Sequence, residues 1–68
     1  MEVEIIKEQQ VENKVYFELK PLDTNYKDKL VFGVEKEADI NNEEEMILLR
    51  SEVITLASNE LEKQLLIR

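Results

Sequence analysis

Apolar and polar residues alternate with a period of two in three stretches of the first half of the chain. The apolar positions are Val3 and Ile5 in the first, Val15, Phe17 and Leu19 in the second, and Leu30, Phe32 and Val34 in the third. Alternation among β-branched and aromatic residues is typical of strands that bury one face. The pattern therefore predicts strands over residues 2–6, 15–20 and 30–35.

The first two strands are expected to form a hairpin in which Ile5 lies opposite Leu19. This register leaves residues 11–13 as a three-residue loop, and loops of this kind usually end in a residue with positive φ, here Asn13. A two-residue loop would slip the pairing by one residue. It would turn two polar residues of the first strand, Glu8 and Gln10, toward the core. The only glycine, Gly33, is expected at a bulge or where another element approaches closely.

The last third of the chain changes to a helical period and predicts one long helix over residues 42–67. Asn41 or Asn42 is the expected N-cap, and Asn42 has Glu45 placed as in a capping box. The fold class is therefore α+β, a three-stranded antiparallel sheet followed by a helix packed on it, in one domain over residues 1–68. The apolar face of this helix covers about half its circumference, wider than the stripe of ~100° that an ordinary surface helix needs. Its members are Met46, Ile47, Leu49, Val53, Ile54, Leu56, Ala57, Leu61, Leu65 and Ile67.

The excess apolar surface predicts a homodimer formed through the helix. A chain of 68 residues is short for a stable core, and without cysteine or histidine it has neither disulfides nor thiolate or imidazole metal sites. Two further leucines, Leu48 and Leu66, fall on the face expected to be wet. The expected interface is Leu48, Ile54, Ala57, Leu61 and Leu65. The alternative is a monomer that packs well without a partner.

The net charge of −7 opposes binding to nucleic acid, whose affinity rests on cationic contacts to phosphate, and to anionic membranes. The start of the chain is acidic and alternating, unlike a secretory signal. The apolar runs of the sequence are far shorter than the ~18 residues of a membrane span. We therefore expect a cytoplasmic protein.

Groups suited to catalysis are scarce in this sequence. It has no histidine or cysteine, and its serines, Ser51 and Ser58, fall inside the predicted helix without a base beside them. There is no glycine-rich phosphate loop. Asp23 and Asn25 resemble the start of a calcium loop, but Lys27 occupies the next ligand position. We expect a protein that is not an enzyme and has no metal or other cofactor.

Acidic residues gather between the third strand and the helix. Residues 35–45 hold six acids and one lysine, a net charge of −5 out of −7 for the chain. The acids, called here the acidic edge, are Glu35, Glu37, Asp39, Glu43, Glu44 and Glu45. They either complement the helix dipole and keep the chain soluble, or they dock a basic protein surface by imitating phosphates. The leading hypothesis is a small acidic protein-interaction module that inhibits or modulates a basic, nucleic-acid-binding partner.

Two alternative functions follow from other features. A structural or assembly subunit would act through the apolar helix face. A sheet-based nucleic-acid accessory factor would use Tyr16 and Lys20, which lie among further lysines and a tyrosine at Lys14, Tyr26, Lys27 and Lys29. In size and acidity the chain is similar to many phage and mobile-element products, a likeness of style that no residue motif carries.

Overall fold

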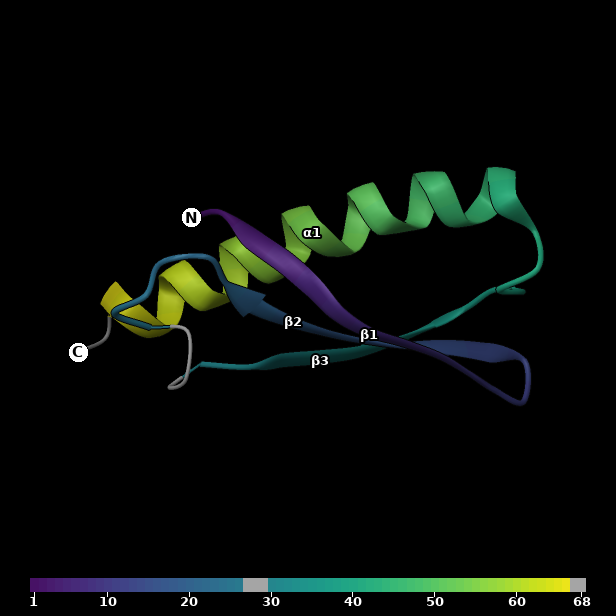
Figure 1. Cartoon of the computed structure of the whole chain (residues 1–68), viewed down its shortest axis with the longest axis horizontal. Coiled ribbons are helices and arrows are strands. Elements are labelled where there is room, and N and C mark those ends of the chain that lie inside the picture. The colour runs from purple at the N-terminus through teal and green to yellow at the C-terminus, as the bar shows by residue number, and fades with distance from the viewer. Residues whose placement is uncertain (27–29, 67–68) are drawn as a thin grey trace.

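The protein is an open three-stranded antiparallel sheet covered on one face by a long C-terminal helix (Figure 1). The computed structural model describes residues 1–26 and 30–66, the last with its backbone only. The elements are β1 (Val3–Val11), β2 (Lys14–Pro21), β3 (Phe32–Glu37) and α1 (Glu43–Leu66), and β2 is the central strand. The predicted α+β class is confirmed.

The core lies between α1 and the face of the sheet that the period-two pattern predicted to be buried. Val15, Phe17 and Leu19 of β2 are fully buried there. The helix contributes the centre of its apolar face, namely Met46, Leu49, Val53, Ala57 and Leu61, and all five are at most 8% exposed. Burying such side chains is the main term that stabilises so small a sheet.

β1 contains an irregularity that changes which of its residues face the helix. Ile5 pairs with Leu19 as predicted, but Lys7 pairs with Glu18, so Ile6 is an extra residue without a partner. Beyond this bulge the alternation of β1 is reversed. Glu8 and Gln10 become the cross-strand partners of the buried Phe17 and Val15, and both are half-buried.

The prediction of a three-residue hairpin loop is therefore wrong. Val11 pairs with Lys14, which leaves Glu12 and Asn13 as a two-residue loop. Positive φ occurs at Glu12 (58°), not at Asn13, and positive φ at the first central residue is the pattern of a type II′ hairpin turn. The bulge absorbs the one-residue slip, because it lets the predicted Ile5–Leu19 pair coexist with the shorter loop.

Gly33 lies in β3 opposite Glu18, where the β2–β3 register is regular, so the expected bulge is absent there. The expected close approach is present. A Cβ atom at this position would lie 2.9 Å from the Tyr16 hydroxyl oxygen. The tyrosine ring thus lies across the outer face of the sheet in space that only glycine leaves open.

The helix begins as expected, with Asn42 as its N-cap. The Glu45 N–H donates to Asn42 Oδ1 at 3.2 Å. The Asn42 N–H donates to the Asp39 carbonyl oxygen at 3.0 Å, so the Glu45 carboxylate is not needed to close a capping box. Glu43, Glu44 and Glu45 occupy the first turn, where carboxylates favour the positive end of the helix dipole.

The sheet covers the centre of the apolar helix face and leaves its flanks uncovered. Ile47 and Ile54, at the edge of this face, are 65% and 38% exposed, and Leu48, on the face expected to be wet, is 75% exposed. The expectation concerning the Leu66 side chain lies outside the described residues, as does that concerning Ile67. Some of the apolar surface of the helix, as predicted, is therefore not covered by the sheet of the protomer. The uncovered part is smaller than the whole apolar face.

Candidate functional site

Two connecting segments, the β1–β2 turn and the β3–α1 connection, meet at one end of the molecule. Figure 1 shows that the β1–β2 turn, the C-terminal end of β3 and the start of α1 all lie at this end, away from both chain termini. The Ala38 N–H donates to the Asn13 carbonyl oxygen at 3.2 Å, which ties the chain after β3 to the hairpin turn.

The side chain of Gln10 joins these segments. Its Nε2 carries two hydrogens and lies within hydrogen-bonding distance of three carbonyl oxygens, those of Glu12 (2.8 Å), Lys14 (2.9 Å) and Ala38 (3.1 Å), so two of these acceptors share one hydrogen. Its Oε1 accepts a hydrogen bond from the Ile40 N–H at 2.8 Å. One amide therefore satisfies backbone groups on both sides of the gap between the hairpin turn and the β3–α1 connection.

An open hollow of about 610 Å³ lies beside Gln10. We call it the acidic hollow. Its lining is Gln10, Glu12, Asn13, Glu37, Ala38, Asp39 and Glu45. Four of these seven residues carry carboxylates, all four are exposed, and none of the seven is basic. The hollow is therefore a concentrated negative surface built from three separate segments of the chain.

Within the described residues, the carboxylates of the hollow have no ion-pair partner. Arg50 pairs with Glu8 (Nε to Oε1, 2.6 Å), Lys36 with Glu52 (3.7 Å) and Lys63 with Glu60 (3.5 Å), all outside the hollow. The Glu8 carboxylate is the main cause of the raised pKa of Arg50, by hydrogen bonding first and by charge second. Lys14 is the cross-strand neighbour of Glu37, yet no ion pair joins them.

The structure divides the acidic edge into three parts. Glu37, Asp39 and Glu45 line the acidic hollow. Glu43 and Glu44 are exposed in the first helical turn outside it. Glu35 pairs with Tyr16 across the sheet and lies on the outer face.

The sequence pattern did not predict that Glu12 and Gln10 belong to this site. The signal that could have found them is the two-residue loop, which was the rejected alternative. That loop turns Gln10 to the helix side and brings Glu12 to the same end as the helix start.

The residues expected at a dimer interface differ in how far the protomer buries them. Leu48 and Ile54 are exposed, and Leu65 is half-buried. Ala57 and Leu61 are completely buried under the protomer's own sheet. They face the sheet because they flank Met46 and Val53 on the helix surface, and they have no side-chain surface left for a partner.

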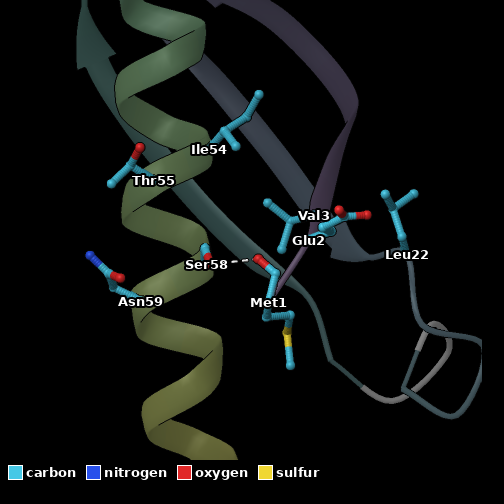
Figure 2. Close-up of a pocket in the computed structure, with 8 residues that line it drawn as sticks. All are labelled: Met1, Glu2, Val3, Leu22, Ile54, Thr55, Ser58 and Asn59. Carbon is cyan, nitrogen blue, oxygen red and sulfur yellow. Dashed lines mark hydrogen bonds between the residues drawn. The ribbon is translucent and has the colours of Figure 1, made fainter.

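A second hollow, of about 380 Å³, lies between α1 and the start of β1 (Figure 2). We call it the terminal hollow. Ser58 Oγ donates to the Met1 carbonyl oxygen at 2.5 Å, and the Met1 ammonium pairs with Glu62. These contacts fix the first residue against the helix. Ile54, Val3 and Leu22 give the hollow its apolar walls.

The outer face of the sheet holds the aromatic residue that suggested nucleic-acid binding. The Tyr16 hydroxyl donates to Glu18 Oε2 at 2.8 Å. This hydrogen bond is the largest cause of the raised pKa of Tyr16, followed by partial desolvation and by the charges of Glu18 and Glu35. Lys7 lies 5.9 Å from the ring centroid. The carboxylates beside Tyr16 oppose the approach of a phosphate backbone. Lys27 and Lys29 lie outside the described residues.

Neither a metal cluster nor a membrane-spanning helix is found in residues 1–26 and 30–66. No three acidic side chains there are arranged to hold one metal ion. No described helix is long and apolar enough to cross a bilayer. No protein-family model matches the chain, and no curated protein or solved structure does either.

Proposed function

We propose that this protein is a non-enzymatic, cytoplasmic interaction module that binds a basic segment of a partner protein in the acidic hollow. The observation that carries the proposal is the gathering of four exposed carboxylates from three segments around one hollow, with Gln10 bonded to the segments on both sides of it. A partner that presents lysine or arginine side chains matches this surface in charge and in hydrogen-bonding capacity.

The helix dipole explains only part of this negative charge. Glu43, Glu44 and Glu45 are accounted for as first-turn residues, which complement the dipole wherever the helix starts. Glu12 belongs to the hairpin turn, Glu37 to the end of β3 and Asp39 to the β3–α1 connection, so none of the three lies in the first helical turn, where the dipole acts most strongly. Their placement next to Glu45 raises the local repulsion between carboxylates, which a bound cation would relieve.

Binding of a basic segment has a simple physical basis here. Charge-assisted hydrogen bonds from ammonium or guanidinium groups to carboxylates are about twice as strong as neutral ones. The net charge of −7 would also steer a basic partner toward the protein over roughly a Debye length. The class of partner that fits best is a protein with a basic, nucleic-acid-binding surface, whose activity the module would inhibit or modulate by occupying that surface.

The test removes three charges from the hollow and compares the variant with one that loses three charges elsewhere. The hollow variant is Glu37→Gln, Asp39→Asn and Glu45→Gln. The matched control is Glu2→Gln, Asp23→Asn and Glu35→Gln, all at exposed positions outside the hollow. Asp23 and Asp39 each accept an N–H two residues ahead at 2.9 Å, so both aspartate changes keep the same local hydrogen bond.

A hexalysine peptide serves as the probe, and its affinity is measured by calorimetry over a series of salt concentrations. We expect the hollow variant to lose ~tenfold or more in affinity at low salt and to show a shallower salt dependence, while the control changes little. Equal losses in the two variants would show that binding follows net charge alone, and the acidic hollow would not be a site.

A further inference from the structure

The two outer strands of the sheet differ in how well their open edges can pair. Within the described residues, the order β1-β2-β3 leaves one edge of β1 and one edge of β3 without a neighbouring strand. The bulge at Ile6 interrupts β1, and bulges are one of the ways in which an edge strand is kept from pairing further. The pairing of β3 with β2 is regular from Phe32 to Glu37. A further strand therefore fits best on the edge of β3.

Alternate residues of β3 direct their backbone N–H and C=O groups to this open edge. Along an antiparallel ladder, hydrogen-bonded pairs alternate with pairs whose backbone groups point away from each other. The hydrogen bond from the Ala38 N–H to the Asn13 carbonyl oxygen fixes the phase of this alternation. Counted back along the β2–β3 register, the backbone groups that face the open edge are those of Gly33, Glu35 and Glu37. An added strand would bond to these groups.

A third hollow, of about 500 Å³, lies between β3 and one flank of α1. We call it the lateral hollow. Its lining is Lys36 of β3 and, from the helix, Leu48, Ser51, Glu52, Thr55, Leu56 and Asn59. Leu48 and Leu56 give it apolar walls, and Lys36 and Glu52 neutralise each other at 3.7 Å. The Thr55 hydroxyl already donates to the Ser51 carbonyl oxygen. An apolar side chain can thus enter the lateral hollow without leaving a buried charge unpaired.

The outer face of the sheet beside the same edge is acidic. Glu35 and Glu37 of β3 are exposed on that face. At Gly33 the Tyr16 hydroxyl takes the place of a side chain, and it donates to Glu18 at 2.8 Å. Within the part of the chain that the structure describes, no lysine or arginine pairs with Glu18, Glu35 or Glu37. An added strand would therefore meet negative charge on its outer face and the lateral hollow on its helix-facing side.

From this arrangement we infer that an extended segment of a partner protein, in which apolar residues alternate with lysine or arginine, adds to β3 as a fourth strand. Side chains alternate between the two faces of a strand, so the apolar ones enter the lateral hollow while the basic ones lie beside Glu35 and Glu37. Main-chain hydrogen bonds supply affinity and the hollow supplies specificity. The inference does not rest on the proposed function, because the lateral hollow and the acidic hollow share no residue.

The first experiment measures the affinity of a fluorescent octapeptide of alternating leucine and lysine by anisotropy. Leu48→Lys places a charge in the lateral hollow, and Ile47→Lys makes the same change at an exposed neighbour outside it. We expect Leu48→Lys to weaken binding ~tenfold or more and Ile47→Lys to change it little. Far-UV circular dichroism checks that both variants fold. Equal losses in the two variants would overturn the inference, as would a failure of the unchanged protein to bind the peptide.

The second experiment tests strand addition with two N-methylated forms of the octapeptide, one methylated at the lysine amides and the other at the leucine amides. The lysine amides face β3 if the peptide adds antiparallel, and the leucine amides face it if the peptide adds parallel. One form should therefore lose binding and the other keep it. Equal binding of the two forms would overturn the inference. Hexalysine has no apolar side chain and Leu48 lies outside the acidic hollow, so this inference and the proposed function fail separately.

Discussion

Replacement of Gln10 by alanine tests what holds the acidic hollow together. The change removes one side chain that bonds to the hairpin turn and to the β3–α1 connection. The bonds to Glu12 and Lys14 are exposed, so water replaces them. The bonds to Ala38 (3.1 Å) and Ile40 (2.8 Å) are partly buried and are the ones whose loss destabilises the fold.

At ~1 kcal/mol of net stabilisation for each partly buried bond, the loss is about 2 kcal/mol. In a domain of this size ~1 kcal/mol shifts the melting temperature by roughly 4–8 °C, so a fall of about 8–16 °C is expected. Gln9→Ala is the matched control, since it makes the same change at an exposed neighbour on the other face of β1. Both variants lose the same strand propensity, and the difference between them isolates the hydrogen bonds.

Thermal unfolding followed by circular dichroism gives the stability, and amide hydrogen exchange at Ile40 gives the local effect. The Gln10→Ala variant should also bind hexalysine more weakly, because Glu12 and Asp39 are no longer held near each other. If the two alanine variants unfold within about 2 °C of each other, the bonds of Gln10 do not stabilise this end and the reasoning is refuted.

Three further predictions concern the outer sheet face and the core. Glu18→Gln should lower the pKa of Tyr16 toward its ordinary 10.0, since Glu18 is the main cause of the raised pKa, and absorbance follows the titration. In the unchanged protein the raised folded-state pKa of Tyr16 contributes stability below pH 10, and this stability is lost as the pH rises through the folded-state pKa. Gly33→Ala should also lower that pKa by displacing the ring, yet change stability by no more than ~1 kcal/mol, because the hydroxyl end of a flexible side chain can move; an unshifted titration would contradict the close approach. Leu61→Ala should cost about 3 kcal/mol in denaturant unfolding and Leu48→Ala less than ~0.5 in dilute protein, since they are 0% and 75% exposed; equal costs would contradict the assigned core.

The parts of the fold that could be predicted from sequence are those with strong periodicity. β2 has an unbroken alternation from Val15 to Leu19, and its buried face was identified residue by residue. The helix has a clear cap at Asn42 and no glycine or proline inside it, so its start was placed within one residue. Burial on one face and backbone capping are local consequences of sequence and can be read directly.

The hairpin could not be predicted correctly because a bulge has no sequence signal of its own here. Ile6 is apolar and fits a strand equally well as a paired or an unpaired residue. The rejected register placed Glu8 and Gln10 on the core side, which is costly if they find no partners. The structure provides those partners in Arg50 and in the backbone groups around residue 40. These contacts are separated by 42 and 30 residues, so no local pattern reveals them.

The same limit affects the candidate sites. The acidic edge is a set of neighbours in sequence, whereas the acidic hollow takes Glu12 from a distant turn. It excludes Glu35, which lies two residues before the end of β3 at Glu37 and therefore further from the hairpin turn. The apolar helix arc was recognised, but how much of it a three-stranded sheet covers depends on the angle and position of the helix. Ala57 and Leu61 proved to be core for that reason.

The central claim is that a basic partner binds at the end of the molecule organised by Gln10. The most direct measurement is a titration of isotope-labelled protein with hexalysine, followed by amide chemical shifts for every residue. Binding at this end should give the largest shifts at residues 10–13 and 37–45, with little change at Glu2, Asp23 or Glu62. Shifts spread evenly over all exposed carboxylates, or concentrated on the outer sheet face around Glu35, would contradict it.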